Sequence, residues 1–183
     1  MSKAEVYFFG QIVGATEFTE GVDGIFVEVF FDHGKNWEFI SGNQTYQTQS
    51  GYVDDDDFVC FAHSFDLHFS TTSYLGWPKI IAKIWKLDET NTIDLLSYGG
   101  MNLPTTKGFH KVSFDTWVLH GDSEKETFSY FLDSKPTMSN SGPIFRKPEL
   151  RNKFITKTGP KIHLEIEVLL KNFEKNKREL ATP

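Results

Sequence analysis

Strict alternation of apolar and polar side chains near the C-terminus is the sequence feature that most constrains the fold. In residues 162–171, Ile, Leu, Ile, Val and Leu alternate with His, Glu, Glu, Leu and Lys. A period of two sends successive side chains to opposite faces of a strand, so this segment predicts a strand with one buried face. Shorter runs of the same kind predict further strands within residues 6–13, 25–31, 65–69, 80–85 and 110–117.

Turn-forming clusters separate these runs, as in Asp32-His33-Gly34-Lys35-Asn36 and Lys107-Gly108. Several short strands separated by turns favour an antiparallel β-sandwich. Aromatic residues make up 15% of the chain, with 18 Phe, and this also favours pleated strands over helical bundles. A length of 183 residues suits a single domain.

One segment departs from the strand pattern. Ser123-Glu124-Lys125-Glu126 has the form of a capping box, and the apolar residues that follow it at helical spacing end before Pro136. We expect one helix of about three turns there. Residues 134–148 are rich in Ser, Pro, Gly and Asn and predict a long loop. The mixed charges at 174–183 predict a solvated tail behind a domain spanning 1–173.

Charge and cysteine content exclude several classes of function. The 19 Lys and Arg against 25 Asp and Glu give a net charge of −6, which argues against nucleic acid as a partner. The single cysteine, Cys60, excludes an intramolecular disulfide, and its apolar neighbours predict a small buried residue. The sequence shows neither a signal peptide nor a membrane span, so we expect a soluble, cytoplasmic protein.

Residues that catalysis or metal binding would require are scattered. His63 and His68 are five positions apart on or beside a strand and would face opposite sides. Asp66 and His68 share a face and Ser70 follows them, but residues two apart on a strand are about 6.6 Å apart, beyond hydrogen-bond reach. The four aspartates at 54–57 predict a solvated loop, since consecutive carboxylates rarely converge on one ion. We therefore expect no enzyme, no metal and no cofactor.

Basic and aromatic residues of one parity occur together at Trp77, Lys79, Lys83 and Trp85. One interpretation is an outer sheet face whose lysine stems cover apolar surface. A second is a face that binds acidic lipid headgroups or a protein partner.

The order of short motifs along the chain resembles the B9-domain family from about residue 4 to 173. The most distinctive pair is Asp66-Leu67-His68-Phe69 followed by Gly76-Trp77-Pro78. The other matching positions are Gly10 to Ala15, Gln47 to Gln49, Trp85, Tyr98-Gly99, Pro104, Gly108, His110, Thr116-Trp117, Arg151, His163 to Ile166 and Lys171 to Phe173.

This resemblance implies a C2-like antiparallel β-sandwich of about eight strands with one short helix in a connection. It also implies a non-enzymatic scaffold of the ciliary transition zone and basal body, within the Meckel-syndrome complex. The implied partners are other B9-domain proteins, namely the Meckel-syndrome type 1 protein and B9-domain-containing protein 1. The alternative is a peripheral C2-type module that binds acidic phospholipids without calcium.

The C2-like frame also bears on particular residues. Calcium-binding C2 domains carry an Asp-x-Asp pair after an apolar-Trp step, whereas here Ile84-Trp85 leads to Lys86-Leu87-Asp88. A lysine among the ligands would repel calcium. Trp77 and Arg151 are the candidate partner-interface residues, and Lys79 and Lys83 form the candidate lipid or partner face. The family signature, expected to build the fold, consists of Asp66, His68, Gly76, Trp77, Pro78 and Trp85.

Overall fold

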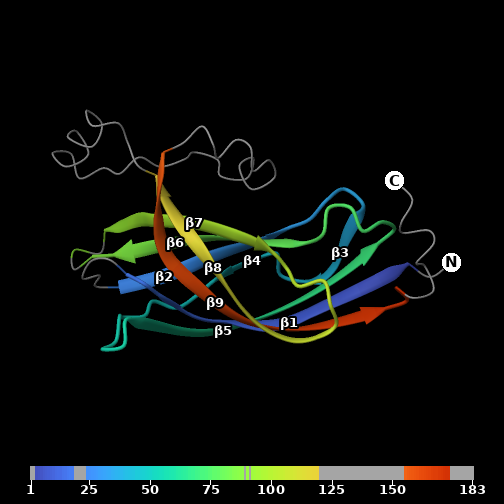
Figure 1. The fold of residues 1–183 in the computed structure, drawn as a ribbon, viewed down its shortest axis with the longest axis horizontal. Coiled ribbons are helices and arrows are strands. Elements are labelled where there is room, and N and C mark those ends of the chain that lie inside the picture. Colours follow the sequence, from blue (N-terminus) through green and yellow to red (C-terminus); the bar gives the residue numbers. More distant parts are fainter. Residues whose placement is uncertain (1–2, 19–23, 89, 91, 120–154, 174–183) are drawn as a thin grey trace.

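The computed structural model describes residues 3–18, 24–88, 90, 92–119 and 155–173 (Figure 1). All regular secondary structure in these ranges is strand, and every pairing is antiparallel. The strands are β1 (Ala4–Thr16), β2 (Gly24–Asp32), β3 (Trp37–Gly42), β4 (Thr45–Gln47), β5 (Phe58–Thr71), β6 (Lys79–Leu87), β7 (Ile93–Asn102), β8 (Gly108–Leu119) and β9 (Thr156–Lys171).

The nine strands form one sheet in the order β3-β5-β1-β9-β8-β7-β6-β2-β4. Its narrowest junction lies between β7 and β8, which pair only at Tyr98 with Trp117 and Gly99 with Thr116. Figure 1 shows β2, β6 and β7 grouped apart from β1 and β5, with the long strands β8 and β9 running between the two groups. The sheet therefore doubles over at the β7–β8 junction into two facing layers.

A buried threonine fastens this junction. The Thr116 hydroxyl lies 2.8 Å from Ser97 Oγ on β7 and donates to the carbonyl oxygen of Pro160 on β9 at 2.5 Å. Beside it, the rings of Tyr98 and Trp117 stack with centroids 5.0 Å apart. Three strands are thus tied at the position where the sheet changes layer.

The opposite side is closed by the chain passing from β3 into β4. β3 pairs with β5 in one layer, whereas β4 pairs with β2 in the other. The Tyr46 hydroxyl on β4 donates to the Asp66 carbonyl oxygen at 3.0 Å and accepts from the Asp66 N–H at 3.3 Å. Gly42 permits the crossing, because its φ is 104° and a Cβ there would lie 2.1 Å from the Asp66 carbonyl oxygen.

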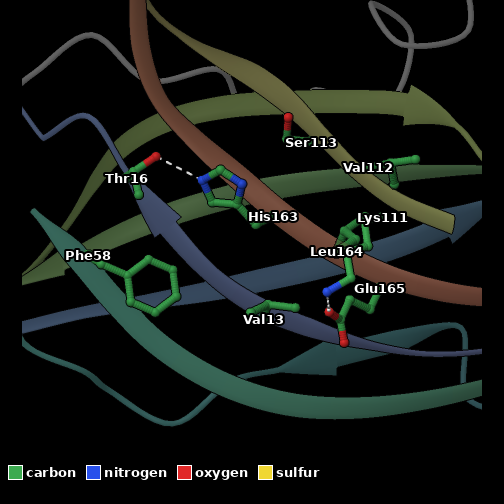
Figure 2. Close-up of a pocket in the computed structure, with 9 residues that line it drawn as sticks. All are labelled: Val13, Thr16, Phe58, Lys111, Val112, Ser113, His163, Leu164 and Glu165. Atoms are coloured by element: carbon green, nitrogen blue, oxygen red, sulfur yellow. Dashed lines mark hydrogen bonds and ion pairs between the residues drawn. The ribbon is translucent and has the colours of Figure 1, made fainter. Parts of the chain in front are cut away.

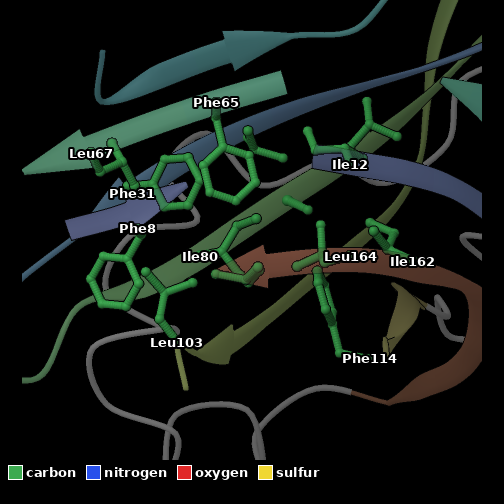
Figure 3. Close-up of a cluster of buried hydrophobic side chains, with 14 of the residues drawn as sticks. Phe8, Ile12, Phe31, Phe65, Leu67, Ile80, Leu103, Phe114, Ile162 and Leu164 are labelled. Carbon is green, nitrogen blue, oxygen red and sulfur yellow. The ribbon is translucent and has the colours of Figure 1, made fainter. Parts of the chain in front are cut away.

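Side chains from both layers meet in one apolar core (Figure 3). Phe31 of β2 lies 5.0 Å from Phe65 of β5, although these strands are not neighbours in the sheet. Burial of large apolar side chains is the main stabilising term for a domain of this kind. The largest fully buried side chains are Phe8, Phe31, Phe61, Phe69, Ile12, Ile25, Leu67, Ile80, Ile84, Leu103, Ile162 and Leu164.

The structure confirms the all-β antiparallel fold and the alternation in β9, where residues 162, 164, 166 and 168 are 0–1% exposed. The described strands number nine rather than about eight, and β4 has only three residues, too few for a periodicity signal. The predicted helix after Ser123, the loop at 134–148 and the tail at 174–183 lie outside the described residues.

The prediction that Cys60 is buried is wrong. Cys60 is exposed because β5 alternates, with Val59 and Phe61 turned into the core on either side of it. The apolar run in the sequence hid this alternation.

We predict that Gly76→Ala lowers the free energy of unfolding by about 2 kcal/mol or more. Gly76 has a φ of 78°, and an added Cβ would lie 2.6 Å from the Gly34 Cα. Gly108→Ala is the matched control, because its φ is 112° but no atom lies within 4 Å of the added Cβ. Strain alone should cost the control about 1 kcal/mol in urea denaturation. Equal losses for both variants would contradict the close contact between Gly34 and Gly76.

Candidate interaction surfaces

Pairing registers place outward side chains of β5, β1, β9 and β8 in four rows, which we call the four-row face. The core face of these strands carries Phe65, Leu67, Phe8 and Leu164, so the residues between them point outward. In order across the strands, the rows are Ser70, Glu5 and Lys171; His68, Tyr7 and Leu169; Asp66, Phe9, Glu167 and Phe109; and Ser64, Gln11, Glu165 and Lys111.

Glu5 in the first row is the centre of a polar cluster that reaches Tyr7 and His68 in the second row. The Glu5 carboxylate accepts a hydrogen bond from Tyr7 at 2.8 Å and pairs with Lys171 at 3.1 Å and with His68 at 3.3 Å. The Tyr7 and His68 rings stack with centroids 4.0 Å apart. The hydrogen bonds from Tyr7 and Lys171 hold the pKa of Glu5 below its usual value, and the bond to Glu5 raises the pKa of Tyr7.

The fourth row is also internally satisfied. Gln11 donates to Glu165 at 2.8 Å, and Lys111 pairs with the same carboxylate at 2.8 Å. The hydrogen bond from Lys111, followed by that from Gln11, lowers the pKa of Glu165. Among the described residues of this face, only the third row therefore presents carboxylates without a partner.

A pocket of about 430 Å³ lies beside the fourth row, where β1 bulges between Ile12 and Gly14 (Figure 2). His163 lines it, and its Nε2 lies 2.8 Å from Thr16 Oγ1. Burial lowers the pKa of His163, the positive charge of Lys161 lowers it further, and Glu17 opposes both. The other lining residues are Val13, Phe58, Lys111, Val112, Ser113, Leu164 and Glu165.

The layer formed by β2, β6 and β7 carries the candidate lysine face. Lys79 and Lys83 lie on one side of β6, directly across from Asp32 and Glu28 of β2. Lys83 reaches Glu28 at 3.5 Å and lies 5.9 Å from the centre of the Trp85 ring, which itself stacks on Phe26. A carboxylate thus stands opposite each lysine.

The sequence placed Trp77 on the same strand face as these lysines, but β6 begins at Lys79. The Trp77 ring instead packs against Trp37 at 4.9 Å and Phe8 at 6.2 Å, and its Nε1 donates to the Leu103 carbonyl oxygen at 3.0 Å. The preceding Gly76 accepts a hydrogen bond from the Gly34 N–H at 2.8 Å. The Gly-Trp-Pro signature therefore ties the β2–β3 and β5–β6 connections to the core.

Other candidate residues are not brought together as a reactive site. Asp66 and His68 lie on the four-row face, where His68 contacts Glu5 and Tyr7, and the buried Ser70 donates to Glu38 at 3.4 Å. Within the described ranges, no group of three or more His, Cys, Asp or Glu is placed to hold a metal ion. Arg151 lies outside the described residues.

Sequence analysis missed the outward residues Phe9, Phe109 and Glu167. Phe9 follows Tyr7 and Phe8, and strict alternation with the buried Val6 and Phe8 would have placed its ring on the surface. Their grouping, however, depends on the register of strands distant in the sequence, so no local pattern reveals it.

The part of the chain that is described contains no helix long and apolar enough to cross a membrane.

These features define an all-β domain whose polar and aromatic side chains are spread across sheet faces. A family model described as "Ciliary basal body-associated, B9 protein" matches residues 6–169. B9 domain-containing protein 2 of Homo sapiens is 31% identical over 94% of this chain and 97% of its own length. B9 domain-containing protein 1 of Xenopus laevis is 26% identical over 72% of this chain and 67% of its own length. The chain belongs to the B9 family.

Among solved structures, a C2 domain of plant Extended Synaptotagmin 1 aligns with 93% of this chain and 97% of its own, at 10% identity and a TM-score of 0.42.

We predict that His163 titrates below its ordinary pKa of 6.5 in an NMR titration of the imidazole carbons. Lys161→Gln should raise this pKa, because it removes a nearby positive charge and leaves Glu17 unpaired. Lys111→Gln is the control, since Lys111 lines the same pocket but is paired with Glu165. An unchanged pKa in the Lys161 variant would contradict this electrostatic account.

The same shift links stability to pH. With its pKa lowered on folding, His163 binds protons better in the unfolded state, so it should reduce the free energy of unfolding as pH falls through 6.5. Protonation of Glu5 and Glu165 affects the free energy of unfolding only below about pH 4.5. Urea denaturation at pH 7.5 and 5.5 should thus show a smaller loss for His163→Gln than for the wild type.

Proposed function

We propose that this chain is a non-enzymatic scaffold subunit at the cilium base, acting as one B9 domain over residues 1–173 with a solvated tail at 174–183. It associates with other B9-domain proteins in the transition zone and basal body. Through that assembly it supports ciliogenesis and the control of ciliary membrane composition. The observation that carries the proposal is the family match over residues 6–169.

The geometry of the described residues supports association over catalysis. Asp66, His68 and Ser70 lie on one strand, and the His68 and Ser70 side chains are engaged by Glu5 and Glu38 rather than by one another. General acid–base and nucleophilic catalysis instead need such groups within hydrogen-bond reach of each other. What the fold offers is broad sheet surface, which suits contact with another protein.

The proposed partners are the Meckel-syndrome type 1 protein and B9-domain-containing protein 1. The similarity to B9 domain-containing protein 1 supports a shared domain architecture between this chain and one partner. Stable association would bury roughly 1,200 to 2,000 Å² of surface.

Binding to acidic lipid without calcium is the alternative. Glu28 and Asp32 on β2 face Lys83 and Lys79 on β6, so the candidate lysine face carries no surplus positive charge. Attraction to an anionic membrane depends on such a surplus. The charge balance of the candidate lysine face therefore favours the scaffold proposal.

Tagged protein expressed in ciliated cells should recover both sister B9 proteins under gentle lysis, and a fluorescent fusion should mark the ciliary base. Phe31→Ala should lose both properties, because truncating this fully buried ring costs about 3–5 kcal/mol. Glu28→Gln, a half-exposed position on the other layer, should behave as wild type. Recovery of neither sister protein with the wild type would overturn the proposal.

Sedimentation with vesicles containing acidic phosphoinositides tests the alternative. We expect wild-type protein to remain unbound at physiological salt, and the Lys79→Glu/Lys83→Glu double variant to give the same result. Salt-sensitive sedimentation of the wild type that the double variant abolishes would favour the lipid module instead.

A further inference from the structure

The third row of the four-row face combines exposed rings with unpaired carboxylates. Asp66, Phe9, Glu167 and Phe109 stand directly across from one another on β5, β1, β9 and β8. Phe9 is 44% exposed and Phe109 is 58% exposed. Neighbouring strands are about 4.8 Å apart, so the backbone positions of Phe9 and Phe109, on either side of Glu167, are separated by roughly 10 Å.

Unlike the first and fourth rows, the third row contains carboxylates that have no partner within the described chain. Glu5, in the first row, and Glu165, in the fourth row, each have a hydrogen bond and an ion pair. The side chains of Asp66 and Glu167 have neither among the described residues. Leu169, which is 49% exposed, extends the apolar surface next to the row. Exposed rings interrupted by free carboxylates form a site that a complementary partner can complete.

The charge of the face indicates the kind of partner. Its four rows hold four carboxylates against two lysines, a surplus of two negative charges on a chain with a net charge of −6. A second copy presenting the same face would bring like charges together, which is unfavourable. Lys111 already lies 5.9 Å from the centre of the Phe109 ring, so this surface accommodates a cation against an aromatic ring.

Arginine fits this arrangement better than lysine. Its planar guanidinium stacks on aromatic rings and donates two parallel hydrogen bonds to a carboxylate, whereas a lysine ammonium is a compact, strongly hydrated charge. A guanidinium above Glu167 would meet the carboxylate below it and a ring on each side.

We propose that the third row is the docking site for an arginine-bearing segment of a partner protein, with the arginine held by Glu167 between Phe9 and Phe109. Asp66 attracts a second basic group at the other end of the row. The inference deepens the proposed function and rests on it for the kind of partner, a sister B9-domain protein.

Binding of purified B9 domain-containing protein 1 from the same species tests the site in the context of that function. Glu167→Gln and Phe9→Ser should each weaken binding about tenfold or more, the loss expected for central interface residues. Glu28→Gln is the matched control, being a carboxylate on the outside of the other layer, and should stay within about twofold of wild type. Circular dichroism and urea midpoints should be unchanged, since Glu167 and Phe9 lie outside the core. Tight wild-type binding that both variants retain would overturn the site while leaving the proposed association intact.

A peptide titration separates the two proposals further. In ¹⁵N NMR spectra, a short peptide containing two arginines should shift amides around Phe9, Glu167 and Phe109. The same peptide with lysines should shift them less, and Glu167→Gln should abolish the difference. If the wild type binds no sister protein yet the arginine peptide shifts these amides, the partner class is wrong and the site stands. No shift with the arginine peptide, or self-association that Phe9→Ser abolishes, would overturn the site.

Discussion

Closure of a single sheet upon itself is the constraint on which the rest of this structure depends. The apolar side chains of β1, β5 and β9 can leave water only if those of β2 and β6 face them, as the contact between Phe31 and Phe65 shows. The fold line needs a narrow junction, supplied by the two residue pairs between β7 and β8. The opposite side is held by the bonds from Tyr46 to the Asp66 backbone.

This closure determines what the surface can present. Once the core takes one face of each long strand, the other face has a fixed set of side chains in a fixed register. On β1 and β9 that register brings Phe9 beside Glu167 and sets Glu5 opposite Lys171. The surface of such a domain is therefore described by which rows have their polar groups paired internally and which do not. The signature at Gly76 and Trp77 contributes indirectly, by fastening two connections to the core.

Local periodicity was sufficient to predict the type of fold but not its closure. The alternation of residues 162–171 predicted β9 and its buried side, because a strand with one face exposed to solvent has apolar and polar side chains at alternate positions. β3 and β4 escaped detection because they are short, and β7 because the burial of its ten residues does not alternate. Cys60 was misplaced because its neighbours masked the alternation. The candidate site was even harder to predict from the sequence. Asp66 and His68 were singled out, yet their neighbours Phe9 and Tyr7 come from a strand more than fifty residues away in sequence. Only pairing register, which depends on the whole sheet, brings them together.

Hydroxyl-radical footprinting of the free chain and of the chain saturated with its proposed partner, B9 domain-containing protein 1, tests the central claim most directly, because aromatic side chains report their own exposure. Phe9 and Phe109 should lose reactivity in the complex, while Tyr52, 71% exposed in the β4–β5 connection, should react as before. Undiminished reactivity of Phe9 and Phe109 in a saturated complex, with protection elsewhere on the domain, would contradict the account.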